Sequence, residues 1–531
     1  MTARTDQLHR PQYMPDLLIR ALDRNADRPA LHLGETTLTA DELRDAMSRY
    51  VQALASLGVG KGTAASMLAR NRPEVLISMG STIVAGCRNT ALNPNSALDD
   101  HAYIVDDAQI EMIVFDPRHF EDHVAELVER CPSLTTVLSL GPSKVGTDIL
   151  ALAEGFEPAP LVAAEVDGED ASSLVYTGGT TGRPKGVVNT FRSGVTLPQI
   201  QMAEWQIPDQ MKFLVCTPLS HAGAAFFLPT LLAGGALVVL EQFSPAAALE
   251  AIEKYRIDAT MLVPTMIYML LDHPDIDTRD LSSLKTVYYG AAAMSPARLR
   301  EGIDKLGPVF FQFYGQSECG MSIAVLRKEE HLVDDPARLA SCGRPVPWLD
   351  VRLLDDDLNE VPVGELGEIC VRGPLVMREY WNKPDETAEA LEGGWLHTGD
   401  VARRDEAGFL SIVDRKKDMI VSGGFNVYPG EIEDVISALP AIADVAVIGA
   451  PDDKWGETVT ACVVLRPGHG ETEAERERIA AEVVDEVKTR RGSVEAPKAV
   501  DFLESIPVTG LGKPDKKALR ARYWEGADRM V

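Results

Sequence analysis

Short apolar runs of β-type residues alternate with helical patterns along much of the chain, and this order constrains the fold more than any other feature. The centre of each run is apolar without alternation, which is typical of parallel strands buried on both faces. The runs lie at 111–116, 172–177, 212–217, 259–264, 284–290 and 308–314. Strands separated by helices predict α/β sheets, which bind ligands at the carboxyl ends of their strands.

One helix is marked at both ends. Thr39 and Glu42 form a capping box before apolar residues at helical spacing, and Gly58 ends the pattern. The stretch 58–63 superficially looks like a nucleoside-triphosphatase P-loop. It lacks Ser or Thr directly after its Lys, and Ala55 stands where that motif requires its first glycine. We therefore interpret these glycines as a helix stop.

Composition bears on the number of structural units, on the possible partners and on the state of the cysteines. A length of 531 residues with 45% hydrophobic content suggests three or four units, some merged into larger folds. The net charge of −28 and the pI near 4.8 argue against a broad nucleic-acid or anionic-membrane surface, so no nucleic-acid partner is expected. The seven cysteines are odd in number and have no paired metal spacing, so we expect reduced and mostly buried thiols.

No segment predicts export or a membrane span. Residues 1–14 are polar and have no apolar signal core, so the expected location is the cytoplasm. The apolar run 222–240 is interrupted by Pro229 and by Gly234-Gly235, which favours a buried helix followed by a buried strand. The Gly-, Pro- and acid-rich stretch 141–171 predicts a surface connection.

Residues 174–187 carry the strongest chemical signal. A β-type run drops into a segment of Gly, Thr and one Lys, and these supply backbone N–H groups, hydroxyls and an ammonium, which are phosphate ligands. A polar hairpin between two strands is the simpler alternative. The stretch resembles the signature loop of the adenylate-forming superfamily, which includes the acyl-CoA synthetases, adenylation domains and luciferases. The resemblance implies that the β- and γ-phosphates of ATP are held by Thr177, Gly178, Gly179, Thr180, Thr181, Gly182 and Lys185.

Further motifs of this family follow in the expected order, so the resemblance spans nearly the whole chain. It implies an α/β fold in which a large N-terminal domain, 1–415, precedes a small mobile α+β C-terminal domain, 416–531. The final segment has its own order: a helix from near Pro429, strands around 445–448 and 458–465, and a charged helix at 471–490. This order is typical of a compact α+β unit.

Residues 312–318 resemble the family's YGxTE element, with Ser in place of Thr. The resemblance implies that Tyr314 lies against adenine, that Ser317 hydrogen-bonds phosphate and that Glu318 holds Mg²⁺. The serine keeps the hydroxyl that this role needs. A core aromatic residue is the alternative for Tyr314. The predicted nucleotide-binding set of this element is Gln312, Tyr314, Gly315 and Ser317.

Residues 395–400 resemble the family's HTGD-type element, which implies that Asp400 takes both ribose hydroxyls. A carboxylate suits this role because it accepts two hydrogen bonds at once. Arg415 is similar to the family's arginine that contacts ribose and phosphate, and its guanidinium stays charged. Without the family match, both residues would be interpreted as turn and surface residues.

Residues 507–513 match the family's PxTxxGK loop, which makes Lys513 the candidate catalytic lysine of adenylation. The acid's carboxylate must attack the α-phosphorus of ATP, and placed cations must stabilise the negative charge. In this interpretation Lys513 bridges carboxylate and α-phosphate, while Lys185 and Mg²⁺ at Glu318 stabilise the departing pyrophosphate. A solvated tail lysine is the alternative.

The second half-reaction implied by the family is thiolysis of the acyl-adenylate by coenzyme A. The C-terminal domain would turn about the hinge residue Lys417 and present Ser422, Gly423 and Gly424 to the pantetheine tunnel. Glycines permit close backbone approach there. The match does not itself distinguish coenzyme A from a carrier-protein pantetheine.

Two segments bear on the acyl group. Residues 217–221 align with the family's aromatic-or-His gate, where His221 would separate the acyl pocket from the thiol tunnel; a satisfied core histidine is the alternative. The following 222–228 contain no acid to pair an α-amino group. The small residues Gly290, Ala291 and Ala292 stand where the family lines its adenine and acyl cleft, so we expect a bulky or long hydrophobic acid.

The sequence therefore predicts an acyl-CoA synthetase that resembles fatty-acid–CoA ligases and uses ATP, Mg²⁺ and coenzyme A to convert a small-molecule carboxylic acid into a thioester. Two alternatives stay open: a ligase that loads a carrier protein, and a nucleotide-binding scaffold without catalysis. A homodimer also stays open.

Overall fold

The computed structural model describes residues 9–177, 183–422, 425–452, 455–508 and 514–524, with Lys417, Asn426 and Gly456 described by their backbone alone. The chain forms two compact units. The first comprises 1–351 and 371–396, and the second comprises 352–370 and 397–531.

A nine-stranded sheet lies in the first unit, with the strand order β16-β15-β14-β13-β12-β10-β11-β1-β2. Its centre is parallel: β10 pairs with β11 and β12, β12 with β13, and β13 with β14. The strands are β1 (Pro29–Leu33), β2 (Thr36–Thr39), β10 (Lys212–Val215), β11 (Ala236–Val239), β12 (Ala259–Leu262), β13 (Thr286–Gly290), β14 (Phe310–Gln316), β15 (Cys319–Leu326) and β16 (Arg344–Pro345). The predicted runs at 212–217, 259–264, 284–290 and 308–314 are thus confirmed as strands.

An eight-stranded sheet completes the first unit, in the order β19-β9-β8-β4-β3-β5-β6-β7. Its strands are β3 (Ala64–Leu68), β4 (Arg88–Ala91), β5 (Met112–Phe115), β6 (Thr136–Ser139), β7 (Thr147–Asp148), β8 (Ala171–Thr177), β9 (Lys185–Thr190) and β19 (Glu379–Tyr380). β5 and β8 confirm the runs at 111–116 and 172–177 as strands, but the prediction that 172–177 is buried on both faces was wrong, because only Leu174 of β8 is fully buried and Val175 is exposed. β9 is antiparallel to β8, and β19 adds to β9 at the edge.

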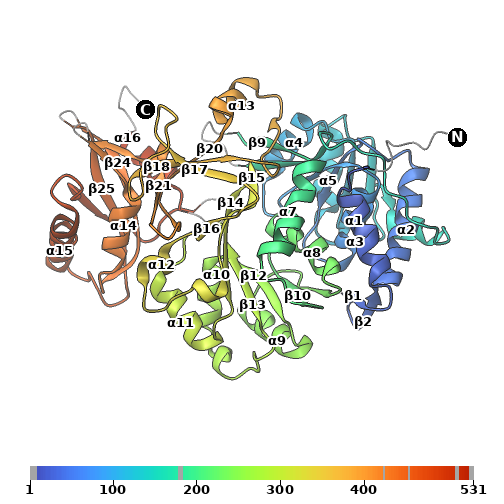
Figure 1. The fold of residues 1–531 in the computed structure, drawn as a ribbon, viewed down its shortest axis with the longest axis horizontal. Helices are drawn as coiled ribbons and strands as arrows, with labels where there is room; N and C mark the ends of the chain where they lie inside the picture. The colour runs from blue at the N-terminus through green and yellow to red at the C-terminus, as the bar shows by residue number, and fades with distance from the viewer. Residues whose placement is uncertain (1–8, 178–182, 423–424, 453–454, 509–513, 525–531) are drawn as a thin grey trace. The chain divides into compact units, whose positions relative to one another are not determined.

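Helices cover both sheets. The helices of this unit are α1 (Met14–Arg24), α2 (Ala40–Ser56), α3 (Pro73–Val84), α4 (Leu98–Asp107), α5 (Pro117–Arg130), α6 (Ile149–Glu154), α7 (Phe191–Glu204), α8 (Phe227–Leu232), α9 (Pro245–Tyr255), α10 (Pro264–Leu271), α11 (Pro296–Leu306), α12 (Pro336–Ala340) and α13 (Pro384–Ala390). Figure 1 shows α9, α10 and α11 beside β12 and β13, with which they share one apolar core. α4 and α5 share a second core with β5.

Local sequence signals explain several of these boundaries. α2 begins at the predicted capping box, with the Thr39 side chain accepting from the Glu42 N–H, and Gly58 follows its end at φ +77°. The apolar run 222–240 folds as the 3₁₀ turn η2 (Ala222–Phe226), α8 and β11, as predicted. The prediction for 141–171 was incomplete, because α6 packs there against α2 and buries Ile149.

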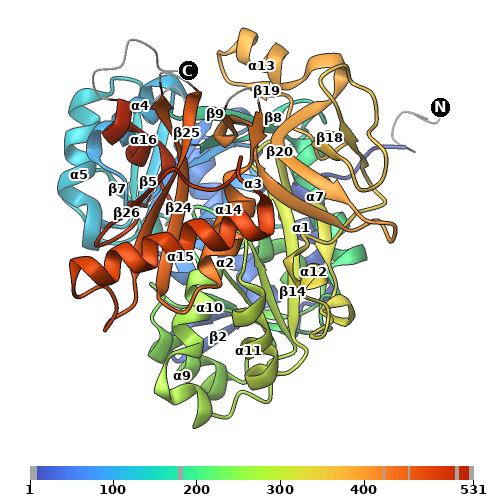
Figure 2. The same cartoon turned by 90° about the vertical axis from the view of Figure 1, so that its left-hand side faces the viewer.

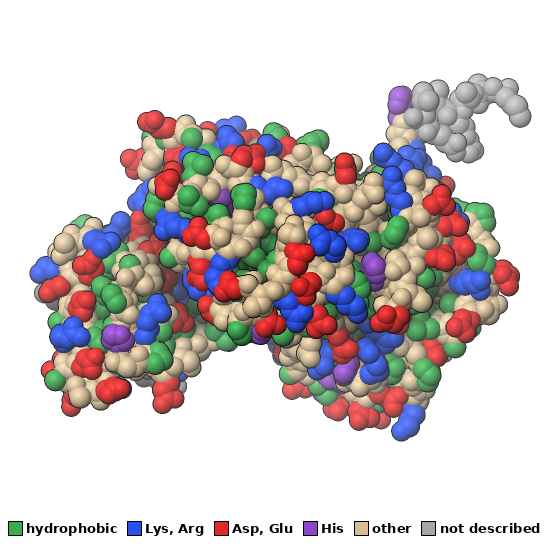
Figure 3. Space-filling model, turned by 90° about the horizontal axis from the view of Figure 1, so that it is seen from below, with side chains coloured by type: hydrophobic (Ala, Val, Ile, Leu, Met, Phe, Trp, Pro, Cys, Tyr) green, Lys and Arg blue, Asp and Glu red, His purple; other side chains and the backbone are tan. Residues whose placement is uncertain are grey.

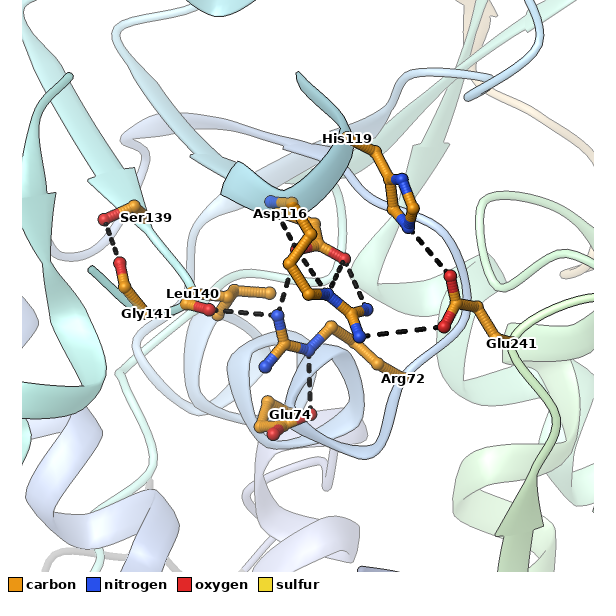
Figure 4. Close-up of polar contacts among 9 residues, drawn as sticks. Arg72, Glu74, Asp116, His119, Ser139, Leu140, Gly141 and Glu241 are labelled. Carbon is orange, nitrogen blue, oxygen red and sulfur yellow. Dashed lines mark hydrogen bonds and ion pairs between the residues drawn. The ribbon is translucent and has the colours of Figure 1, made fainter. Parts of the chain in front are cut away.

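An ionic cluster lies at the carboxyl ends of β3 and β5 (Figure 4). β4 and β5, the next two strands in sequence, flank β3 on its two sides. Asp116 is fully buried and accepts hydrogen bonds from Arg72 and Arg118. Burial alone would raise the pKa of Asp116, but these two guanidinium groups outweigh it and lower the pKa. Glu241, which follows β11, pairs with His119 and Arg118. These ion pairs thus connect the segment after β11 of the nine-stranded sheet to α5, which follows β5 of the eight-stranded sheet.

The second unit contains most of a four-stranded sheet, β17-β18-β20-β21, and a sheet built from β23, β22, β25, β24 and β26. The strands are β17 (Asp350–Leu354), β18 (Leu366–Arg372), β20 (Leu396–Arg404), β21 (Leu410–Arg415), β22 (Ile420–Ser422), β23 (Phe425–Val427), β24 (Ile442–Asp452), β25 (Gly456–Leu465) and β26 (Ala499–Phe502). The helices are α14 (Pro429–Ser437), α15 (Glu473–Arg491) and α16 (Lys516–Trp524). Figure 2 shows α15 crossing the sheet, where Ile479, Val483 and Val487 join its core. The predicted α+β order of this segment is confirmed.

The charged side chains, the cysteines and the helix lengths can be compared with the predictions made from composition. Acidic and basic side chains are interspersed over the face seen in Figure 3. All seven cysteines are free and buried, as predicted. Among the described residues, no helix is both long and apolar enough to cross a membrane.

Candidate active site

The Gly/Thr/Lys segment connects two antiparallel strands. Thr177, the last residue of β8, is the register partner of Lys185, the first residue of β9. The segment therefore does join two antiparallel strands, as the hairpin alternative states. This topology is compatible with phosphate binding, which stays a prediction. Its predicted ligands Gly178, Gly179, Thr180, Thr181 and Gly182 lie outside the described residues.

Lys185 lies within a small charged network at the base of this hairpin. Its Nζ is 2.5 Å from Glu386 Oε2 on α13 and 5.1 Å from the ring centroid of Tyr380. The Tyr380 hydroxyl donates to Glu318 Oε1 at 2.8 Å. Burial, followed by the nearby carboxylate of Glu318, raises the pKa of Tyr380, so this phenol stays protonated. The structure thus links Lys185, the predicted phosphate ligand, to Glu318, the predicted Mg²⁺ ligand, through one tyrosine.

Four parallel strands bring the other predicted residues of this unit to one sheet edge. His221 follows β10, Gly290 ends β13, and Tyr314 lies near the end of β14. β10 also marks the point where the strand order reverses, because the next strands in sequence, β11 and β12, lie on opposite sides of it. Ligands of open α/β sheets bind at such a point.

His221 is partly buried beside η2. Its Nδ1 lies 2.8 Å from the Ser220 hydroxyl. Burial lowers the pKa of His221, so the neutral ring is favoured at neutral pH. A neutral, partly buried imidazole fits the predicted gate, and it equally fits the alternative of a satisfied histidine.

The chain passes from the core to the surface at the end of β13. Tyr288 and Tyr289 are fully buried, while Ala291 and Ala292 are exposed. A Cβ at Gly290 would come within 2.4 Å of the Phe313 carbonyl oxygen, so only glycine fits against β14. Of the three small residues predicted to line a cleft, Ala291 and Ala292 are therefore exposed, whereas Gly290 is buried.

The β14–β15 turn carries the YGxTE-like element. Gln312 is buried, and its Oε1 accepts from the Tyr289 hydroxyl at 3.4 Å. Tyr314 and Ser317 are partly buried rather than enclosed in the core. At Gly315 a Cβ would lie 2.4 Å from the Met321 nitrogen, which explains the glycine in this tight turn.

In the second unit, strand pairing joins Asp400 to Arg415. The two residues are register partners on β20 and β21, and Arg415 Nε lies 2.5 Å from Asp400 Oδ1. Asp400 is 3% exposed, whereas the Arg415 side chain is 42% exposed. The two predicted ribose ligands are therefore brought together.

Sequence reasoning missed Glu368, Tyr380 and Glu386. Glu368 on β18 accepts from the Gly399 N–H at 2.8 Å and pairs with His397 and with Lys416. A carboxylate directly before the apolar residues of a strand was the available signal for Glu368. Nothing near Tyr380 or Glu386 in the sequence indicates Lys185 as a neighbour.

Glu368, Cys370 and His397 place their ligand atoms within 4.8 Å of one another. The ammonium of Lys416 already lies 3.5 Å from Glu368 Oε2, and burial raises the pKa of Cys370 to about 12. A paired carboxylate and a protonated thiol do not favour a metal ion, so we interpret this group as support for the HTGD-type turn.

The remaining predicted residues lie in the C-terminal segment. Lys417 lies in the 3₁₀ turn η6 (Lys416–Asp418) directly after β21, and Ser422 ends β22 and is buried. Gly423, Gly424 and Lys513 lie outside the described residues. The ends of the Lys513 loop are joined, since Val508 and Pro514 form a β-bridge.

Comparison with known proteins identifies the class. The model of the AMP-binding enzyme family matches residues 18–381, and the model of the AMP-binding enzyme C-terminal domain matches residues 431–513. The chain belongs to the AMP-binding enzyme family. It is an acid–thiol ligase, which activates a carboxylic acid with ATP as the acyl-adenylate and transfers the acyl group to coenzyme A. The predicted domain boundary after residue 415 stays a prediction.

Three relatives define the similarity. A medium/long-chain-fatty-acid–CoA ligase, FadD8, of Mycobacterium tuberculosis is 53% identical over 99% of this chain and 92% of its own length. The amide bond synthetase McbA of Marinactinospora thermotolerans is 33% identical, with a TM-score of 0.86 over 95% of this chain and 99% of that one. ATP-bound MatB of Rhodopseudomonas palustris is 28% identical, with a TM-score of 0.85 over 96% of this chain and 99% of that one. These structures share the predicted fold.

Proposed function

We propose that this ligase acts on medium- to long-chain fatty acids. The observation that carries the proposal is the 53% identity to a medium/long-chain-fatty-acid–CoA ligase, which extends over 99% of this chain. The exposed small residues Ala291 and Ala292 and the lack of an acid in 222–228 support an uncharged, voluminous acyl site. An amino-acid substrate would need a carboxylate for its ammonium group.

We assign the nucleotide-binding roles by family resemblance together with the contacts described above. Lys185 and the hairpin loop bind the β- and γ-phosphates, Tyr314 lies against adenine, and Asp400 and Arg415 bind the ribose. Lys513 is the cation that approaches the α-phosphate during adenylation. These groups stabilise charge and supply no covalent nucleophile.

Glu318 suits Mg²⁺ because carboxylate oxygens are the ligands this ion prefers. The Tyr380 hydroxyl fixes one of its oxygens and thereby orients the carboxylate. When bound, Mg²⁺ neutralises charge on the phosphates. The residues present therefore fit the ion.

For thioester formation, we propose that Lys417 is the hinge and that Ser422, Gly423 and Gly424 face the pantetheine arm of coenzyme A, with His221 as the gate. The domain boundary after residue 415 is part of this proposal. A carrier-protein acceptor, a homodimer and a cytoplasmic location stay predictions.

A substrate panel tests the proposed specificity. The protein is incubated with ATP, Mg²⁺, coenzyme A and one acid at a time: acetate, propionate, octanoate, dodecanoate, palmitate or ferulate. Thioesters are then measured by mass spectrometry. We expect the longer aliphatic acids to give the highest kcat/KM. Faster turnover of acetate or propionate than of every larger acid would contradict the proposal, and turnover with a phosphopantetheinylated carrier protein but not with free coenzyme A would reassign the acceptor.

A further inference from the structure

Lys185 already has an anionic partner within the protein. Glu386 Oε2 lies 2.5 Å from Lys185 Nζ, and the two side chains are only 31% and 20% exposed. This oxygen has no hydrogen-bond partner in the part of the chain that the structure describes, so the contact is one of charge. The Glu386 carboxylate therefore occupies the ammonium group that is proposed to bind the phosphates of ATP.

The backbone holds Glu386 in this place. β19 pairs with β9 through Tyr380 and Val187, and the backbone N–H of Trp381 donates to the Gly186 carbonyl at 2.7 Å. α13 follows at once, and the Thr387 hydroxyl accepts from the Tyr380 N–H at 3.0 Å. Glu386 therefore stands next to an anchored residue on a helix fixed against the base of the hairpin. It is not a flexible surface side chain that meets Lys185 by chance.

A carboxylate and a triphosphate compete for one ammonium because both are anions and repel each other at short range. We propose that Glu386 is a resident counter-ion of Lys185, which the β- and γ-phosphates of ATP displace on binding, so that Glu386 sets the affinity for ATP. This inference rests on the proposed role of Lys185. Tyr380 keeps the ammonium over its ring in either state.

The substitution Glu386→Gln removes the competing charge and keeps the shape of the side chain. A partly exposed ion pair is worth about 0.4–1 kcal/mol, so ATP should bind about two- to fivefold more tightly. Inorganic tripolyphosphate should show the same gain. AMP should bind unchanged, because it has no β- or γ-phosphate to meet Lys185.

The experiment is isothermal titration of the full chain with ATP, AMP and tripolyphosphate, in the absence of any carboxylic acid. Glu389→Gln is the matched control, because Glu389 is exposed on the same helix and carries the same charge. Unchanged AMP affinity shows that each variant is folded. The expected result is tighter ATP binding for E386Q alone.

Two outcomes separate the inference from the function on which it rests. Equal or weaker ATP binding by E386Q, with Lys185→Met weakening ATP, overturns the counter-ion role and leaves Lys185 as a phosphate ligand. If Lys185→Met leaves the affinity for ATP unchanged, the proposed role of Lys185 itself fails. An equal gain for E389Q would make the effect one of general charge and would also overturn the inference.

Discussion

The partly buried lysine Lys516 should stabilise the C-terminal segment in a pH-dependent manner. Its Nζ lies 2.8 Å from Glu433 Oε1, and the two side chains are 16% and 22% exposed. Burial alone would lower the pKa of Lys516, but the charges of Glu433 and Asp414 outweigh it and raise the pKa. Lys516 therefore stays protonated, pairs with Glu433 and also attracts Asp414.

The variant Lys516→Met keeps the apolar stem and removes the charge, which leaves Glu433 unpaired. Removing one partner of a fully buried pair costs about 3–5 kcal/mol. Because this pair is partly exposed, we expect a cost of about 2–3 kcal/mol at pH 8. That cost corresponds to about 30- to 150-fold faster amide exchange in α16, measured by hydrogen-exchange mass spectrometry.

The sign of the pH effect follows from Glu433, whose pKa is raised by burial although Lys516 opposes the shift. A carboxyl with a raised pKa contributes stability below its unfolded pKa and loses it as the pH rises through the folded pKa. Without Lys516 the shift is larger, so the variant should lose more stability between pH 5 and pH 8 than the parent does.

Two further variants make the reasoning refutable. Lys488→Met changes an exposed lysine on α15 and should alter exchange in α16 by less than the equivalent of about 0.5 kcal/mol. The double variant Lys516→Met/Glu433→Gln should recover most of the loss, because Gln keeps the oxygen that accepts from the Val447 N–H. A loss that is equal at both pH values, or a double variant no more stable than K516M, would refute the account.

Three more variants test the site. Asp400→Asn should raise the KM for ATP by about tenfold in steady-state assays, with little change in the KM for the acid, because the carboxylate pairs with Arg415 and is proposed to bind ribose. His221→Asn should flatten the fall of Tm as the pH drops below about 6.5, because burial lowers the pKa of His221 and stability is lost as that ring is forced to protonate. Gly290→Ala should lower the stability by about 2 kcal/mol or more in thermal unfolding, since its Cβ would lie 2.4 Å from a carbonyl oxygen; Gly320→Ala, whose Cβ would meet nothing closer than 3.8 Å, is the control.

The sequence predicted those parts of the fold that depend on local signals. The capping box at Thr39 begins α2, and Pro229 with Gly234-Gly235 divides the apolar run into a helix and a strand. Buried parallel strands were recognisable because each is apolar on both faces. The two-residue strands β7 and β19 were not recognisable, since two residues show no periodicity.

Site residues were predictable where a motif carries them and not where long-range pairing brings them in. Asp400 and Arg415 come from separate motifs, and the β20–β21 register joins them. Tyr380 reaches Lys185 only because β19 pairs with β9 from nearly two hundred residues away in the sequence. No local pattern encodes such a neighbour, so Glu386 could be found only in the structure.

These pairings have one energetic consequence for nucleotide binding. Lys185 and Arg415, both proposed to contact ATP, each have an internal carboxylate at 2.5 Å. On this proposal, ATP meets cations that are already paired, and its binding exchanges one set of charge contacts for another. The net binding free energy of ATP is smaller than the sum of its new contacts. Each displaced carboxylate must either be solvated by water or accept hydrogen bonds from hydroxyl groups of the ligand. Asp400 has such a use, since ribose hydroxyls can donate to it. Glu386 has none, which is why its removal should favour ATP whereas removal of the Asp400 charge should not.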